Sequence, residues 1–330
     1  MLRAVSLLPS ATEALSHIGG EHLLVGRSHE CDFPSSIAHL PVLTAARTDF
    51  NTAGAAAVDA QVRAAASARH SLYTLDESLL ASLRPDVVLT QDLCHVCSID
   101  LAAVQRLVSH LSPSPRIVSL NPTTLEDVLD DLLTIGEATN LHAPAEVAVS
   151  RLRSRFYAAA EFVNPFLDGP TIAFLEWTDP PFIGGHWTPQ LIERAGAVHP
   201  LNPTDRVPTA GAGAGPIGST LRSAGKSVRV PTDVLVASRP DRVIVCPCGL
   251  SLAQARAEVD RLEHDSPWWR ELTHRHGVRT AMVDGNQMFS RPGPRLVDAF
   301  EWLVGWINDR PELIPAGFPW LEHAPASPRL

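Results

Sequence analysis

The 330-residue sequence lacks clustered basic residues: it has 27 Lys and Arg against 36 Asp and Glu, a formal net charge of −9. Without a basic run there is nothing to neutralise phosphates, so we expect no nucleic-acid partner and no anionic membrane surface. The sequence also lacks an apolar run of about 18 residues, which excludes a transmembrane helix and predicts no membrane insertion.

No export signal is recognisable either. The short apolar run Ala4–Leu8 is broken by Pro9 and is typical of a strand. The chain has only 5 cysteines, an odd number, and without an export signal this usage suggests a reducing compartment. We therefore expect a cytoplasmic protein. Ser/His/Asp, HExxH and Walker A patterns are all missing, so the sequence does not support a hydrolase or an NTPase.

The sequence does contain a long helical pattern between Ala143 and Pro165. Apolar side chains recur at spacings of three and four, including Val149, Leu152 and Phe156, and so share one helix face. Similar sets of short strands and helices precede and follow it. We interpret it as a helix that joins two lobes; the alternative is an ordinary amphipathic helix packed inside one domain.

Both halves of the chain show the same order of elements. Arg84-Pro85-Asp86 and Arg239-Pro240-Asp241 each precede a buried strand that ends near cysteines. Short apolar strands alternating with helices favour parallel sheets. We predict an α/β fold of two Rossmann-like parallel-sheet lobes joined by one long backbone helix, with an N-terminal lobe at 1–142, the helix at 143–165 and a C-terminal lobe at 166–330.

Polar side chains follow several of the predicted strands. In open parallel sheets, ligands bind beyond the carboxyl ends of the strands. If the lobes face each other, these ends line one cleft. The ligand-binding candidates at strand ends are Ser10, His29, Glu30, Gln91, Trp177 and Asn286.

An aromatic stretch, Glu176–Trp187, adds Phe182, His186 and Trp187 as candidates. We expect its prolines and glycines to hold it as a rigid loop, and flat side chains in a concave site suit a planar ligand. The alternative is a loop whose tryptophan side chains pack against its own lobe. His186 could be a metal ligand or be satisfied by the backbone.

The cysteines suggest a metal site. Cys94-x-x-Cys97 could be a redox pair, or a pair of soft metal ligands completed by other cysteines or a histidine, or simply apolar filling. Our metal-ligand candidates are Cys94, Cys97, Cys246 and Cys248.

Four segments resemble the cobalamin-binding (vitamin B12) branch of the class III, helical-backbone substrate-binding proteins, part of the Fe/B12 periplasmic-binding superfamily. They are Val5–Glu13, Ser28–Pro34, Leu89–Cys97, and Asp284-Gly285-Asn286 with Phe289–Leu296. The resemblance implies two lobes, a corrinoid or siderophore-like ligand between them, little hinge motion and an ABC transporter as partner.

In exported members of this branch a tryptophan tends to follow the first Pro-Asp strand, where this chain has Gln91. Tyr73, Trp177, Phe182 and Trp187 remain as aromatic walls, and Phe289 lies in a matching segment.

The predicted function is non-catalytic binding of cobalamin or another metal-containing tetrapyrrole, in corrinoid or metal-chelate uptake or handling. The main alternative is a metal- or thiol-dependent enzyme, chelatase- or reductase-like, that uses the cleft cysteines. A third possibility is a scaffold that has lost its ligand and binds a protein partner.

Overall fold

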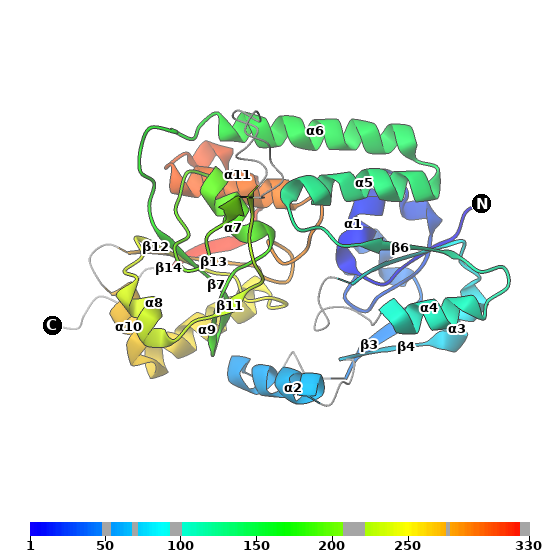
Figure 1. Ribbon diagram of the computed structural model, residues 1–330, viewed down its shortest axis with the longest axis horizontal. Coiled ribbons are helices and arrows are strands. Elements are labelled where there is room, and N and C mark those ends of the chain that lie inside the picture. The colour runs from blue at the N-terminus through cyan, green and yellow to red at the C-terminus, as the bar shows by residue number, and fades with distance from the viewer. Residues whose placement is uncertain (48–53, 68–71, 93–100, 207–221, 275–277, 324–330) are drawn as a thin grey trace.

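Two β-sheets, one in each half of the chain, form the centres of two lobes that lie side by side beneath a layer of helices (Figure 1). The structure is a computed structural model, and it describes residues 1–47, 54–67, 72–92, 101–206, 222–274 and 278–323. The predicted two-lobed α/β fold is confirmed.

The N-terminal lobe contains a four-stranded sheet in the order β2-β1-β5-β6, and all its neighbouring strands are parallel. Its central strand β5 is buried along its whole length, as expected for a strand covered by helices on both faces. The elements are β1 (Ala4–Ser6), α1 (Pro9–His17), β2 (Leu24–Arg27), β3 (Thr44–Ala46), α2 (Ala55–Ser67), β4 (Tyr73–Leu75), α3 (Glu77–Leu83), β5 (Val87–Gln91), α4 (Leu101–Ser109), β6 (Arg116–Leu120) and α5 (Leu125–Thr139).

The C-terminal lobe has a six-stranded sheet in the order β11-β8-β7-β12-β13-β14. Its centre, β7-β12-β13, is parallel as predicted, but the β7–β8 and β13–β14 pairs are antiparallel. The elements are β7 (Ile172–Thr178), β8 (Pro181–Ile183), α7 (Trp187–Arg194), β9 (Asp205–Arg206), β10 (Arg222–Ser223), β11 (Val228–Arg229), α8 (Thr232–Ala237), β12 (Arg242–Val245), α9 (Leu252–Asp265), α10 (Pro267–Thr273), β13 (Arg279–Val283), α11 (Leu296–Ile307) and β14 (Trp320–His323).

The stretch expected to be an aromatic loop is the source of one antiparallel pair. Trp177 on β7 lies opposite Phe182 on β8, and Asp179-Pro180 makes the turn between them. Prolines at a turn and at the first residue of a strand remove no hydrogen bond from the sheet interior, so the pairing survives them. The expectation of a rigid, strand-free loop is therefore wrong.

The two Arg-Pro-Asp motifs occupy equivalent places in the lobes. The arginine of each has a left-handed backbone, with φ of 43° and 45°. Asp86 accepts a hydrogen bond from the backbone N–H of Arg3 through Oδ2 (2.7 Å), and Asp241 accepts one from that of Thr171 (2.8 Å). The same local sequence thus turns a helix into a central strand in both lobes.

The helix α6 (His142–Ala160) runs along the top of the molecule and connects the lobes (Figure 1). It is fastened to α11 of the C-terminal lobe: Arg155 pairs with Asp298 and Glu301 at 2.5 Å each, and the rings of Phe156 and Phe300 stack 4.0 Å apart. The division of the chain at residues 142 and 165 stays a prediction.

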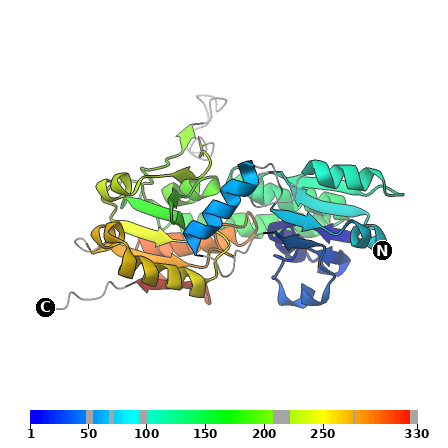
Figure 2. The ribbon, with the colours of Figure 1, turned by 90° about the horizontal axis from the view of Figure 1, so that it is seen from below.

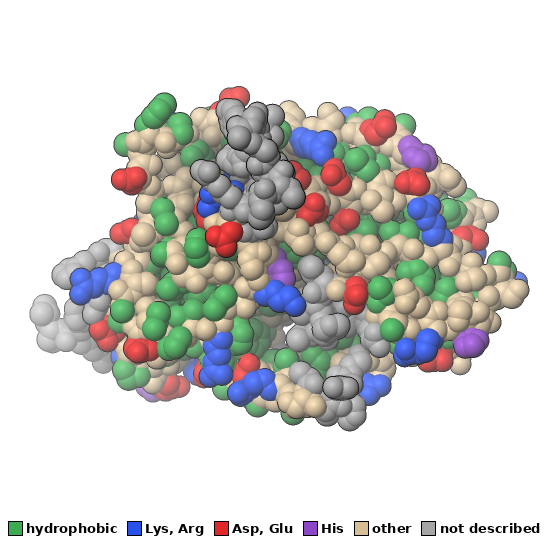
Figure 3. All heavy atoms as spheres, viewed as in Figure 1, with side chains coloured by type: hydrophobic (Ala, Val, Ile, Leu, Met, Phe, Trp, Pro, Cys, Tyr) green, Lys and Arg blue, Asp and Glu red, His purple; other side chains and the backbone are tan. Residues whose placement is uncertain are grey.

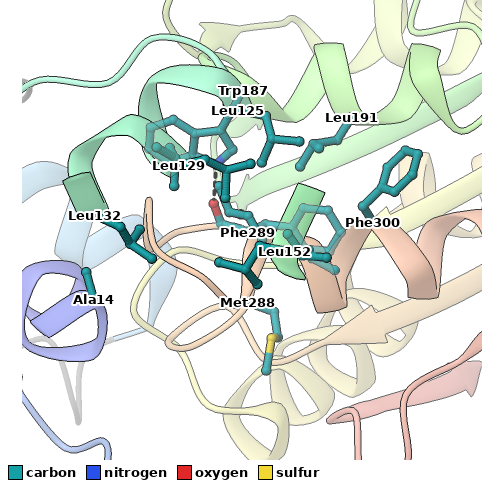
Figure 4. Close-up of a cluster of buried hydrophobic side chains, with 14 of the residues drawn as sticks. Ala14, Leu125, Leu129, Leu132, Leu152, Trp187, Leu191, Met288, Phe289 and Phe300 are labelled. Atoms are coloured by element: carbon teal, nitrogen blue, oxygen red, sulfur yellow. Dashed lines mark hydrogen bonds between the residues drawn. The ribbon is translucent and has the colours of Figure 1, made fainter. Parts of the chain in front are cut away.

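One hydrophobic core extends through both lobes. It joins side chains of α1 and α5 to those of α6, α7 and α11 (Figure 4). Ala14, Leu132, Leu152 and Phe300 all belong to it and are at most 3% exposed. The lobes therefore share packed side chains beneath the helical layer.

Candidate ligand-binding cleft

The surface is hollowed between the two lobes, on the side of the molecule away from α6 (Figure 3). The carboxyl ends of β2 in one lobe and of β7 and β13 in the other lead into the loops that meet at this junction. Such ends are where open parallel sheets bind ligands.

The wall on the N-terminal lobe brings together three of the predicted residues, His29, Glu30 and Tyr73. The Tyr73 hydroxyl donates to Glu30 Oε1 (3.2 Å), and the rings of His29 and Tyr73 lie 5.6 Å apart. Thr44 of β3 holds His29 from behind, with 2.6 Å between Thr44 Oγ1 and His29 Nδ1. Thr44 thus engages His29 Nδ1, and His29 Nε2 lies 4.0 Å from Glu30 Oε1, the atom that accepts from Tyr73.

The protonation of His29 follows from its partial burial. Burial, the largest effect, lowers the pKa of His29 below its ordinary 6.5; the nearby Glu30 carboxylate opposes this shift and Arg27 adds to it. A neutral imidazole accepts or donates one hydrogen bond at each nitrogen and adds no positive charge to the wall.

A buried ionic seam joins the lobes next to this wall. Glu13 of α1, 3% exposed, accepts hydrogen bonds from Arg291 (2.9 Å, Oε1) and Arg295 (2.7 Å, Oε2), both of which follow β13. Arg291, 7% exposed, also donates to Asp32 at 2.6 Å. Burial alone would raise the pKa of Asp32, but the hydrogen bonds and charge of Arg291 and the amide of Asn286 hold it below its ordinary value.

Asn286, predicted to bind ligand, is part of the seam. Its Nδ2 donates to Asp32 Oδ2 (3.0 Å) and its Oδ1 accepts from Arg291 (3.2 Å). Its amide holds the two lobes together, which sequence spacing did not indicate.

Trp177 contacts the opposite lobe. Its indole Nε1 donates to the carbonyl oxygen of Ala55 at the start of α2 (3.1 Å), and both Trp177 and Phe182 are half-buried on the β7–β8 hairpin. Glu176, beside it, accepts from the Ser227 hydroxyl (2.7 Å). This hairpin forms the wall on the C-terminal lobe.

Trp187 and Phe289 were predicted to face a ligand, and the structure corrects this. They are 5% and 2% exposed, and the Trp187 indole donates to the Phe289 carbonyl at 2.6 Å inside the shared core (Figure 4). Trp187 begins α7, and a helix that packs on a sheet turns its apolar side chains inward. Both residues anchor the core.

The other predicted residues lie near strand ends but are less open. Ser10 and Gln91 are 4% and 8% exposed, on α1 and at the end of β5. His186 is half-buried, its backbone N–H donates to the Gly225 carbonyl (2.8 Å), and burial followed by the charge of Lys226 lowers its pKa.

The cysteines divide into described and undescribed ones. Cys246 is fully buried, its Sγ lies 3.6 Å from the Met288 carbonyl, and burial raises its pKa well above the ordinary value. Cys248 is partly exposed. Cys94 and Cys97 lie outside the described residues. Among the residues that the structure does describe, no group of three or more His, Cys, Asp or Glu could hold a metal ion. The cross-lobe metal site stays a prediction.

Sequence reasoning missed Glu13, Asp32, Thr44 and the two arginines of the seam as interacting groups. Arg291 and Arg295 stand in a segment that carried the family resemblance. Arg291 and Arg295 are 278 and 282 positions away from Glu13 in the sequence, and no local pattern predicts a contact over such a separation.

This fold is similar to that of several solved structures over nearly its whole length. A periplasmic heme-binding protein from Pseudomonas aeruginosa matches with a TM-score of 0.64 and 19% identity, covering 93% of this chain and 92% of that one. The periplasmic heme-binding protein RhuT from Roseiflexus sp. RS-1 gives 0.63 and 17%, covering 94% and 98%. The periplasmic vitamin B12 binding protein BtuF of Vibrio cholerae gives 0.61 and 16%, covering 94% and 98%.

The chain therefore has the fold of the class III substrate-binding proteins, in agreement with the resemblance found in its sequence. No family model and no curated protein matches the sequence.

The expectation of a cytoplasmic protein is contradicted, because the similar structures are periplasmic binding proteins. That expectation came from the lack of a recognisable export signal and from the odd number of cysteines. The interpretation of Ala4–Leu8 as a strand is confirmed, since Ala4–Ser6 form β1. Among the described helices, none is long and apolar enough to cross a membrane.

Proposed function

We propose that the protein binds a corrinoid in the cleft between its lobes, without catalysing a reaction on it, as the ligand-binding component that serves an ABC transporter. The fold of heme- and vitamin B12-binding proteins supports a tetrapyrrole as ligand. The charges around the cleft favour a corrinoid, with its rim of neutral amides, over a heme with its two propionates.

The observation that carries this preference is the engagement of the arginines near the cleft. Arg291 and Arg295 pair with the carboxylates of the seam. Arg27 donates to the carbonyls of Ser28, Cys31 and Ala38. A propionate gains most from a bidentate arginine, and each of these three already has partners.

The polar groups of the walls suit amides instead. Glu30 and Glu176 accept from the Tyr73 and Ser227 hydroxyls, and a carboxylate has acceptor sites for more than one bond, so it can also accept from amide N–H groups. The Tyr73 hydroxyl, which donates to Glu30, can also accept. A carboxylate of the cleft wall would repel a heme propionate, which disfavours heme as the ligand.

Equilibrium dialysis of the purified protein against cyanocobalamin and against hemin tests the proposal. We expect cyanocobalamin to bind at least about tenfold more tightly, a difference of about 1.4 kcal/mol. Equal or tighter binding of hemin would reverse the assignment, and no binding of either would reject a tetrapyrrole ligand.

The chain offers a matched pair of variants for this test, since it has 2 tyrosines. Tyr73→Phe removes the hydroxyl of the wall and keeps the ring; a lost hydrogen bond of about 0.5–1.5 kcal/mol should weaken cyanocobalamin binding about two- to tenfold. Tyr157→Phe changes an exposed ring on α6 and should leave the affinity unchanged.

The alternative of a thiol-dependent enzyme gains no support from Cys246, whereas Cys248 is partly exposed. The Cys246 thiol is 0% exposed and its pKa is raised, whereas a reactive cysteine is a partly exposed thiolate.

A further inference from the structure

The helix α2 reaches from one lobe to the other. At its start, Ala55 bonds to Trp177, and a Cβ added to Gly54 would lie 4.0 Å from Glu258 Oε1 on α9. At its end, Ser67 is followed five residues later by Leu72, whose carbonyl accepts from Arg47 at the base of the β3–β4 pair. Five residues span at most about 18 Å, so the end of α2 lies close to the N-terminal lobe.

The length of α2 matches a bridge between the lobes. Its 13 residues make a rod about 20 Å long at about 1.5 Å per residue. Figures 1 and 2 show it outside both sheets, on the side opposite α6 and across the junction of the lobes.

One face of α2 points into the molecule along its whole length. Ala55, Val58, Val62 and Ala65 follow one another at spacings of three and four, which places them on one side of a helix. The first two are 3% and 4% exposed, and the last two are half-buried. The exposed residues are Ala56, Ala57, Ala60, Arg63, Ala64 and Ser67, and two polar residues next to the stripe, Asp59 and Gln61, are half-buried.

The half-buried part of this stripe comes after the contact with the C-terminal lobe. From there α2 continues towards the N-terminal lobe, and the hollow of Figure 3 lies just above it, with hydrophobic side chains at its lower edge. Val62 and Ala65 continue the stripe whose first two members, Ala55 and Val58, are buried, so they lie on the side of α2 that faces the molecule. Valine and alanine are small, so a flat macrocycle can approach the helix closely.

We propose that α2 is the floor of the binding cleft: Val62 and Ala65 contact an apolar part of the bound corrinoid. This inference rests on the proposed function.

Two identical substitutions at adjacent positions of α2, which point to different sides of the helix, test the floor. Ala65→Asp places a carboxylate against the ligand, where it cannot be solvated, and should weaken cyanocobalamin binding in equilibrium dialysis about tenfold or more. Ala64→Asp makes the same change on the exposed side and should leave the affinity within about twofold of wild type, as exposed substitutions usually do. Equal affinities of the two variants would overturn the floor.

Hydrogen exchange on wild-type protein is independent of any variant: the α2 amides should exchange more slowly with cyanocobalamin bound, and unchanged exchange counts against the floor.

These outcomes separate the two proposals. If wild-type protein binds neither cyanocobalamin nor hemin, the proposed function is wrong and the floor falls with it. If wild-type protein binds cyanocobalamin and Ala65→Asp binds it equally well, the function stands and only the role of α2 is wrong.

Discussion

At the scale of the residue, the charged seam between Glu13, Asp32 and the arginines after β13 differs from the many ion pairs on the surface. Glu13 and Arg291 are 3% and 7% exposed, so removal of either partner leaves a buried charge with fewer compensating groups. Exposed pairs lose little when broken, because water replaces the partner.

Arg291→Ala should therefore lower the free energy of unfolding by about 3 kcal/mol or more, the cost of an uncompensated buried charge. Arg153→Ala is the control: Arg153 pairs with Asp130 at 2.7 Å on the surface, and its loss should cost less than about 1 kcal/mol. Urea denaturation of both variants measures the difference. Equal losses would mean that the seam is not a major source of stability.

At the scale of the element, α6 acts as a connection because it packs along its length. Its buried face comprises Ala145, Ala148, Val149, Leu152, Phe156 and Ala159, close to the face that periodicity predicted. Its outer face is exposed, and its arginines reach α5 and α11. Helical propensity starts such an element, but packing supplies most of its stability.

Phe156→Ala should cost about 3–5 kcal/mol in the free energy of unfolding, because it leaves a cavity beside Phe300. Phe162→Ala, just beyond α6, is the matched control: Phe162 is 43% exposed and its loss should have a small effect. Thermal or urea unfolding of both variants provides the measurement. If Phe162→Ala lowered the free energy of unfolding more than Phe156→Ala does, the more important contact of this region would lie outside α6.

At the scale of the whole molecule, the lobes are held at three levels. The shared core lies beneath α6, the seam lies beside the cleft, and α2 crosses the junction on the opposite side. Hinge closure needs a few residues between lobes that absorb a large backbone change. Here the connection is a packed helix.

Small-angle X-ray scattering of the protein with and without cyanocobalamin should accordingly give profiles that superimpose. A clear decrease in the radius of gyration with ligand would mean that the seam and the core open in the free protein.

Local patterns in the sequence determined the elements and their order. The Arg-Pro-Asp motifs at 84 and 239 were predictable as helix-to-strand turns, because their geometry depends on residues next to each other in the chain. The face of α6 was predictable for the same reason. His29 and Glu30 were predictable as wall residues because the carboxyl ends of parallel strands share one edge of a sheet.

Only the tertiary structure decided which groups meet. Tyr73 reaches Glu30 across 43 positions and Arg291 reaches Glu13 across 278, and these contacts depend on how the sheets and the two lobes pack. The dense aromatic stretch around Trp187 has the composition of a ligand wall, yet α7 turns that indole into the core. The alanine-rich segment of α2 has no feature that marks it as a bridge. It becomes one because the packing of the two lobes brings Ala55 to the Trp177 indole.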